Sequence, residues 1–409
     1  MADSATGGRN GINRRRLLTG GAAALATTAT LAQCATTEKL TATEYFGTDT
    51  EPFHGAHQGG VTTVPQAHAM FIALDLATND DRNPRDTLAA ILKLWSADAE
   101  RLTQGVPALA DTEPELALRP ARLTVTVGLG PTVFDRIGLA EARPASVAAL
   151  PPFSTDRLEP RWCGGDLLLQ ICADDPMVVA HTSRVLLKNV RSMTAHRWRQ
   201  SGFRNARGAY SAGPTTPTMR NLMGQVDGTS NLREDADFDR RVWDDGTQQS
   251  WFTGGTVLVL RRIRAELDSW DELDRADKEL TVGRRLDTGA PLTGVSEFDE
   301  PDLAATEGGI AVIPPNAHIA LARHRDVDER FLRRGYNYDD MPAAGQTTDC
   351  GLVFAAFQRD PRRQFIPVQQ RLADADALNR WVTTIGSATF AILPGMPAGS
   401  YLGHPLLEQ

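Results

Sequence analysis

An alternation of apolar strand-like runs with helix-like segments constrains the fold of this chain more than any other feature. Residues 67–76 (AHAMFIALDL) form an apolar run, which is typical of a buried strand. Residues 84–102 then place leucine, isoleucine and tryptophan at helical spacing, behind a proline that suits the first turn of a helix. This order, in which helices separate the strands, predicts an α+β chain.

The same order continues along the chain and divides it into two halves. In the first half, further strands are predicted at 121–127 and 165–171, and further helices at 132–139 and 176–188. A segment that contains glycine and proline, 208–217, separates the halves. In the second half the predicted strands are 254–264, 309–313, 352–358 and 388–393, and the predicted helices are 266–273, 275–283, 365–371 and 374–382. Each half resembles a ferredoxin-like unit, although no sequence repeat is visible.

The body of the chain is acidic. The 409 residues carry a net charge of -8, with 41% hydrophobic and 23% charged residues, which suits a soluble protein of two domains. Arg9, Arg14, Arg15 and Arg16 against Asp3 give the first 35 residues a charge of +3, so the remainder carries -11. An acidic surface argues against nucleic acid and anionic membrane as partners.

The first 35 residues are typical of an export signal. Residues 13–18 (NRRRLL) precede a mildly apolar stretch, rich in alanine and threonine, that is too short to span a bilayer. This order resembles a twin-arginine signal, whose machinery exports folded proteins, often with a cofactor inserted. We therefore expect a periplasmic, extracellular or cell-surface protein. Two alternatives stay open: LAQC at 31–34 resembles a lipoprotein box that would attach lipid to Cys34, and the segment could be a basic disordered tail.

Residues 316–338 contain a candidate metal ligand and a candidate charged donor. His318 follows the apolar run 309–313 and two prolines, and a neutral imidazole at the end of a strand can ligate a metal. Arg333 lies beside apolar residues and Gly335, so its guanidinium can be carried inward, where it stays charged. A core histidine and a solvated arginine are the alternatives that these residues leave open.

Residues 224–229 (GQVDGT), between the two halves, form a second candidate segment. Gly224 and Gly228 permit a tight turn or a close approach of the backbone to a flat ligand, with Asp227 held beside that surface. The alternative for Asp227 is an aspartate that only stabilises a turn.

Several motifs in register resemble the dye-decolorizing peroxidases, a family of haem b enzymes. GQVDGT is similar to the GxxDG signature of that family. Other similar segments follow the family's order along residues 50 to 409, and they are PFHGAHQGGV, LPPFSTDRLEP, GGDLLLQICADD, WFTGGTVLVLRRIR, NAHIALAR, FLRRGYNY, GLVFAAFQRDPRRQFIPVQQRL and LPGMPAGSYLGHPLL. The resemblance is to the subgroup that the twin-arginine machinery exports.

The resemblance implies two ferredoxin-like domains with antiparallel sheets, the dye-decolorizing peroxidase or chlorite dismutase-like fold. The implied organisation is a twin-arginine signal peptide at 1–35, an N-terminal arm at 36–60, a first ferredoxin-like domain at 61–215 and a second, haem-binding one at 216–409. The implied cofactor is one haem b per chain, and a homo-oligomer stays open.

The resemblance also implies roles for individual residues. His318 matches the iron ligand, Asp227 the distal aspartate and Arg333 the distal arginine. The residues implied in cofactor binding are His318, Arg333, Gly228 and Thr229. Some relatives have an asparagine two positions after the arginine, where this chain has Gly335, so no distal asparagine is assigned.

The implied activity is that of a peroxidase, which reduces hydrogen peroxide and oxidises dyes, phenols or other bulky reductants through a ferryl intermediate. Cleavage of peroxide needs a proton moved between its oxygens and a positive charge beside the leaving oxygen, and Asp227 and Arg333 suit these tasks. An alternative function is haem handling, either release of iron from haem as in a deferrochelatase or carriage of haem.

Reductants too large for a buried haem must be oxidised at the protein surface through aromatic side chains. The candidate surface radical sites are Tyr336 and Trp381, followed by Tyr338 and Trp251. Core packing is the alternative for each of these four side chains.

Overall fold

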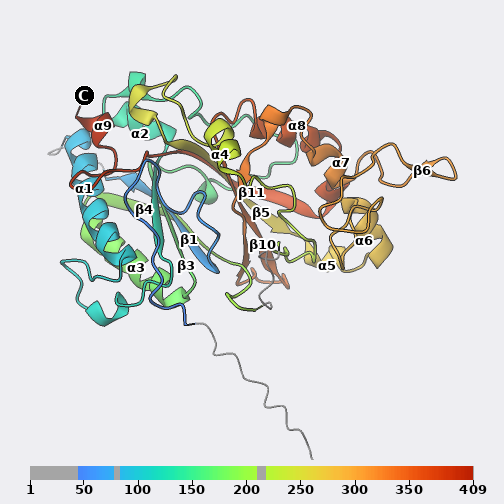
Figure 1. Cartoon of the computed structure of the whole chain (residues 1–409), viewed down its shortest axis with the longest axis horizontal. Helices are drawn as coiled ribbons and strands as arrows, with labels where there is room; N and C mark the ends of the chain where they lie inside the picture. The colour runs from blue at the N-terminus through green and yellow to red at the C-terminus, as the bar shows by residue number, and fades with distance from the viewer. Residues whose placement is uncertain (1–44, 78–82, 210–217, 409) are drawn as a thin grey trace, which may run out of the picture. The chain divides into compact units, whose positions relative to one another are not determined.

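The computed structural model of this chain describes residues 45–77, 83–209 and 218–408 (Figure 1). The predicted signal peptide and the box around Cys34 therefore lie outside the described residues, as does the predicted domain boundary at 215/216. Within the described ranges, no helix has the length and apolar character that crossing a membrane requires.

The first half folds as a ferredoxin-like unit, as predicted. Its strands are β1 (His68–Leu76), β2 (Thr124–Leu129), β3 (Leu167–Ala173) and β4 (Thr194–Phe203), which pair antiparallel in the order β2-β3-β1-β4. Helix α1 (Pro84–Thr103) follows β1, and helix α3 (Pro176–Val190) follows β3. Both helices begin at a proline behind a side chain that caps the free N–H groups, Asn83 for α1 and Asp175 for α3.

The second half repeats this topology. Its strands are β5 (Thr256–Ala265), β9 (Tyr336–Asp340), β10 (Asp349–Gln358) and β11 (Val382–Ile392), which pair antiparallel in the order β11-β5-β10-β9. A short strand, β8 (Leu332–Arg333), also pairs with β10. In each half the first strand lies between the third and the fourth, so the prediction of two ferredoxin-like units with antiparallel sheets is confirmed.

The remaining helices lie in the connections. The α-helices are α2 (Pro131–Arg136), α4 (Asp235–Arg241), α5 (Leu267–Trp270), α6 (Arg275–Val282), α7 (His318–Ala322), α8 (Phe365–Ala375) and α9 (His404–Leu407). The short 3-10 helices are η1 (Pro114–Leu116), η2 (Ala140–Ala142), η3 (Pro160–Trp162), η4 (Ser250–Phe252), η5 (Val327–Glu329) and η6 (Ala377–Arg380).

The edges of the two sheets meet, so the strands close into one barrel-like sheet. Ala391 of β11 pairs with Leu129 of β2, and Phe203 of β4 pairs with Asn337 of β9. The side chains that point to the inside form a buried apolar cluster, which includes Phe71, Leu258, Phe357 and Phe390. Closure leaves the central strands without free edges.

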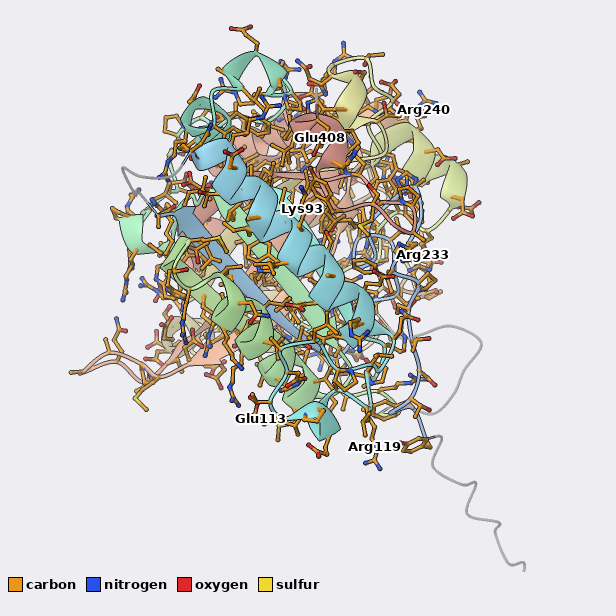
Figure 2. All side chains as sticks on the ribbon, turned by 90° about the vertical axis from the view of Figure 1, so that its left-hand side faces the viewer. Lys93, Glu113, Arg119, Arg233, Arg240 and Glu408 are labelled. Atoms are coloured by element: carbon orange, nitrogen blue, oxygen red, sulfur yellow. The ribbon has the colours of Figure 1, made fainter. Side chains whose placement is uncertain are left out.

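Helices cover the outside of this sheet. Figure 2 shows α1, which carries Lys93, lying across the first half with α3 beside it. Leu88, Ile91 and Trp95 of α1 recur at helical spacing and are fully buried against the sheet. Helix α8 covers the second half, where Phe365 packs in a cluster with Val259 of β5.

The strand predicted at 309–313 is shorter than expected and lies outside the main sheet. This run contributes only to a hairpin of β6 (Thr306–Glu307) and β7 (Ile310–Ala311), which projects at the right of Figure 1. Gly308 and Gly309, with φ of 59° and 84°, form its two-residue turn. Ile310 is 76% exposed, and the second strand of this half is β9 instead.

Candidate active site

His318 is the first residue of α7, directly behind a turn that contains two prolines. Its Nδ1–H donates a hydrogen bond of 2.6 Å to Oδ2 of Asp376. A carboxylate partner holds the proton on Nδ1, so Nε2 keeps a lone pair. No described residue forms a hydrogen bond with Nε2, and the side chain is 32% exposed. The lone pair is therefore available to a metal.

Asp376 is held rigidly in place. Its other oxygen, Oδ1, accepts a hydrogen bond of 2.9 Å from the backbone N–H of Leu378 and so caps η6. Burial lowers the pKa of His318, but the charge and the hydrogen bond of Asp376 outweigh burial, so the net pKa is raised. A carboxylate in this position also makes the imidazole a stronger electron donor.

Asp227 and Arg333 form an ion pair at the same site. Nη1 of Arg333 donates a hydrogen bond of 2.8 Å to Oδ1 of Asp227. Both side chains are partly exposed, at 29% and 19%. Their charges act on His318 with opposite signs, since Asp227 raises its pKa and Arg333 lowers it. The structure therefore brings together the three side chains that the sequence singled out.

The loop around Asp227 depends on two glycines. Gly224 and Gly228 have φ of 87° and 134°, a region that side chains disfavour. The side-chain oxygen of Asn221 accepts hydrogen bonds from two backbone N–H groups of the loop, those of Met223 and Gln225. The backbone N–H of Asp227 in turn donates to the carbonyl of Met219. These hydrogen bonds thus fix the backbone of Asp227, from which its side chain extends.

Asn231 holds the backbone of Arg333 from two sides. Its Oδ1 accepts from the N–H of Arg333 at 2.8 Å, and its Nδ2 donates to the carbonyl of Arg333 at 2.7 Å. The predictions from sequence did not include Asn231 or Asp376. The sequence indicates a role for Asn231 only through its position close behind the GQVDGT segment. It gives no indication of a role for Asp376, because the hydrogen-bond partner of Asp376, His318, lies in a distant part of the chain.

Thr229 and Gly228 lie in the same loop as Asp227. The hydroxyl of Thr229 donates to Oε1 of Glu297 at 3.0 Å, and that oxygen also accepts from Thr218. Thr229 therefore ties the loop to the segment around Glu297, and Gly228 offers backbone without a side chain.

Comparison with known proteins decides the family. The sequence model described as "Dyp-type peroxidase, N-terminal" matches residues 58–204, and the model described as "Dyp-type peroxidase, C-terminal" matches residues 218–397. The chain belongs to the Dyp-type peroxidase family. It is therefore an enzyme, a haem peroxidase that uses hydrogen peroxide.

Three relatives illustrate the similarity of this Dyp-type peroxidase to known proteins. A "Dye-decolorizing peroxidase" of Thermobifida fusca is 44% identical over 364 residues, which are 86% of this chain and 84% of that protein. A "Deferrochelatase" of Escherichia coli is 35% identical over 98% of both chains. The crystal structure of a DyP-type peroxidase from Cellulomonas bogoriensis is 48% identical, with a TM-score of 0.85 over 90% of this chain and 100% of that one.

The donor set of this Dyp-type peroxidase fits haem better than a bare metal ion. A bare ion needs several protein ligands, whereas a haem iron needs one axial imidazole because the macrocycle supplies the other four donors. Within the described ranges, no group of three or more His, Cys, Asp or Glu could hold an ion. His54 and His57 do not converge either, because His54 contacts Glu100 and His57 contacts the carbonyl of Gly254.

The four aromatic residues named as candidate surface radical sites are buried in this structure. Tyr336 is 0% exposed and Tyr338 1%, because β9 points both side chains into the barrel-like sheet. Trp381 is 8% exposed and packs edge-to-face on Trp270 at 5.3 Å between ring centroids. Trp251 is 4% exposed. The aromatic periodicity of these segments reflects core packing, which was the alternative in each case.

Proposed function

We propose that this Dyp-type peroxidase binds one haem b per chain through Nε2 of His318. It would use peroxide to oxidise dyes, phenols or other bulky reductants. The observation that carries the proposal is the arrangement of His318, backed by Asp376, near the ion pair of Asp227 and Arg333. When bound, the haem supplies an iron centre that can exchange two electrons with peroxide.

The two charged residues would divide the work on peroxide. The carboxylate of Asp227 accepts a proton from one peroxide oxygen and returns it to the other, which leaves as water. The positive charge of the Arg333 guanidinium stabilises the negative charge that develops on the leaving oxygen. Two reductant molecules, each losing one electron and one proton, complete the reaction to two waters. Gly228 and Thr229 would let the backbone of the loop approach the flat cofactor.

An absorption spectrum of the purified holoprotein tests this proposal. We expect a Soret band that changes on addition of one equivalent of peroxide and returns when a phenol such as guaiacol is added, with oxidised guaiacol accumulating over many turnovers. A protein that only bleaches under peroxide, without turnover of guaiacol, would be a haem carrier and would overturn the proposal.

Release of iron from haem is the second candidate function. It is favoured by the relative described as a deferrochelatase, which is 35% identical over 98% of both chains. Porphyrin without iron fluoresces, whereas haem does not. Incubation of the holoprotein with a reductant and an iron chelator would therefore give porphyrin fluorescence if this function is present, and none if the protein is only a peroxidase.

We also propose that the twin-arginine machinery exports the protein. The support is the sequence NRRRLL at 13–18. Replacement of Arg14 and Arg15 by lysine should keep the precursor in the cytoplasm, because the machinery recognises the arginine pair. Export of this variant at the wild-type level, or lipid attachment at Cys34, would contradict a soluble exported protein.

A further inference from the structure

One segment of the second half contacts both sides of the candidate active site. Residues 283–300 lie between α6 and the hairpin of β6 and β7, and we call them the strap. At its start, a Cβ at Gly283 would lie 2.7 Å from Cγ1 of Ile319, so only glycine allows this close an approach. Ile319 directly follows the candidate iron ligand, so the strap begins in contact with helix α7.

The middle of the strap packs on the GQVDGT loop. A Cβ at Gly289 would lie 2.9 Å from Cβ of Val226, a residue of that loop. Arg220 pairs with Val226 in an isolated bridge. The guanidinium of Arg220 donates hydrogen bonds to two carbonyls of the strap, those of Leu286 at 2.5 Å and Asp287 at 2.6 Å. The strap therefore contacts this loop through both backbone and side chains.

Glu297 of the strap binds the same loop through its carboxylate. Its Oε1 accepts hydrogen bonds from the hydroxyls of Thr218, at 2.5 Å, and Thr229, at 3.0 Å. Thr229 follows Gly228 in the loop, and Thr218 packs on Gly228, since a Cβ there would lie 3.2 Å from Cγ2 of Thr218. Hydrogen bonds to an ionised acceptor are stronger than those between neutral groups. Glu297 therefore fixes the loop where it offers backbone without a side chain.

A buried arginine holds the backbone of Glu297. Arg284 is 8% exposed, and its Nη1 donates to the carbonyls of Gly289 at 2.6 Å and Glu297 at 2.9 Å. Burial lowers the pKa of Arg284 and the charge of Glu297 opposes this, but the charge of Arg333 lowers the pKa again. The strap thus lies within electrostatic reach of the distal arginine.

The strap ends at the far end of α7. Glu300 forms an ion pair with Arg323, the residue that follows this helix. The two side chains are 73% and 39% exposed, so this pair contributes little on its own. The strap therefore contacts the segment of the iron ligand at both of its ends and the distal loop between them.

We propose that the strap holds the two sides of the haem site together, and that Glu297 is the positioning residue through which it fixes the distal loop. The proposal rests on the proposed function, because haem bound through His318 is part of that function. The iron ligand and the distal loop belong to different segments, and the strap contacts both. Loosening the strap should therefore speed the loss of haem.

Transfer of haem from the holoprotein to excess apomyoglobin tests the proposal, because the Soret band changes as haem is transferred. Glu297→Leu removes both hydrogen bonds and should raise the transfer rate about tenfold or more. Glu297→Gln keeps an oxygen that can accept from both hydroxyls and should stay within about threefold of wild type. Glu300→Gln should raise the rate about twofold at most.

Variants of the loop show whether Glu297 acts through it. Thr218→Val/Thr229→Val keeps the shape of both side chains but removes the same two hydrogen bonds, so it should reproduce the increase even if Glu297→Leu does not fold. When Glu297→Leu is added to this pair of substitutions, the two effects should not multiply, because both remove the same contacts. Effects that multiply in full would overturn the positioning role of Glu297.

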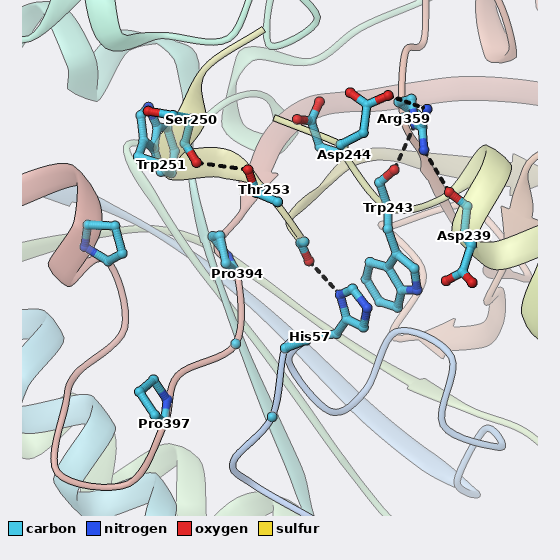
Figure 3. Close-up of a pocket in the computed structure, with 16 residues that line it drawn as sticks. His57, Asp239, Trp243, Asp244, Ser250, Trp251, Thr253, Arg359, Pro394 and Pro397 are labelled. Atoms are coloured by element: carbon cyan, nitrogen blue, oxygen red, sulfur yellow. Dashed lines mark hydrogen bonds and ion pairs between the residues drawn. The ribbon is translucent and has the colours of Figure 1, made fainter. Parts of the chain in front are cut away.

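Two controls separate this role from a general loss of stability. Arg359, at the pocket in Figure 3, also joins segments of the second half: it donates to the carboxylate of Asp245 and to the carbonyls of Trp243 and Asp239. That pocket shares no lining residue with the strap or the candidate active site. Arg359→Leu should lower the melting temperature but leave haem transfer unchanged. Glu307→Leu, in β6 beyond the strap, replaces an exposed glutamate and should change neither.

The outcomes distinguish this inference from the proposed function. Equal transfer rates for wild type and Glu297→Leu would overturn the inference alone, because both proteins would contain haem. The same would follow if Arg359→Leu sped haem transfer as much as Glu297→Leu at an equal loss of melting temperature. A wild-type protein without a Soret band would instead overturn the proposed function, and the inference with it.

Discussion

His318 and Asp376 are 58 positions apart in the sequence, yet they are joined by a hydrogen bond of 2.6 Å. The same aspartate caps η6 with its second oxygen. The orientation and the electron density of the candidate iron ligand are therefore set by a residue of a different segment, at the end of helix α8.

Asp376→Asn should raise the midpoint reduction potential of the bound iron. The amide has no negative charge, so the imidazole of His318 becomes a weaker donor and stabilises the oxidised iron less. Spectroelectrochemical titration of the holoprotein measures this shift. Asp374→Asn is the control, since Asp374 is exposed and accepts a hydrogen bond from Gln370. Identical potentials in wild type and Asp376→Asn would mean that this hydrogen bond does not tune the ligand.

His318→Ala should give a folded protein that contains little haem, with partial recovery when imidazole is added to the medium. The ratio of Soret to protein absorbance measures haem content. His324→Ala should keep full haem content, because His324 is exposed. The opposite result, with haem lost only in His324→Ala, would move the ligand to that residue.

The sequence was informative where local pattern determines structure. The apolar run of β1 and the helical spacing of α1 predicted these elements closely, and the glycines of GQVDGT predicted the loop that holds Asp227. The resemblance to a known family selected His318 and Arg333 from among several candidates. These residues are recognisable because each lies in a distinctive short motif.

The sequence was not informative where partners come from distant segments. Strand β4 (TAHRWRQSGF) has too many polar residues to be recognised, since only every second side chain from Trp198 to Gly202 faces the core. The apolar run 309–313 was predicted as a strand of the second half, but it forms only the two-residue strand β7 of a hairpin, in which Ile310 is exposed. Asp376 and Asn231 act through contacts that only the folded chain creates.

Tyr336→Phe should leave the oxidation of a bulky dye within about twofold of wild type. The phenol is fully buried, and its hydroxyl forms no hydrogen bond with a carboxylate or imidazole of the described residues. The guanidinium of Arg204 lies 5.2 Å from the ring centroid, and a nearby cation opposes removal of an electron. Steady-state turnover of the dye checks this expectation. A loss of tenfold or more, with haem content unchanged, would restore Tyr336 as a radical site.

Asp98→Asn should stabilise the protein near neutral pH. Burial raises the pKa of Asp98, and the negative charge of Asp111 raises it further. The hydrogen bond from Asn189 and the positive charge of Arg101 lower this pKa, but the net shift is upward. The folded state therefore binds the proton of the Asp98 carboxyl more tightly than the unfolded state does. As the pH rises and Asp98 loses this proton, the free energy of unfolding falls.

The difference in melting temperature between Asp98→Asn and wild type should therefore be positive near pH 7. It should shrink toward zero at acid pH, where Asp98 is protonated in both states. Thermal unfolding followed by circular dichroism across this range provides the measurement. A difference that does not depend on pH would show that the carboxylate is not destabilised by burial.

Arg333→Leu and Asp227→Asn should both keep haem and fold but slow the first reaction with peroxide. Loss of a preorganised charge typically costs on the order of 100-fold or more in rate, and loss of proton transfer roughly 100- to 10,000-fold. Stopped-flow mixing of the holoprotein with peroxide measures this rate from the change of the Soret band. Arg330→Leu is the control, since Arg330 lies in the same segment but pairs with Asp237; it should react like wild type.

The two variants remove different contributions. Asp227→Asn removes the group assigned to move the proton, and Arg333→Leu removes the positive charge beside the leaving oxygen. If both variants react as fast as wild type, the ion pair of Asp227 and Arg333 is structural, and the peroxide must be handled by other side chains.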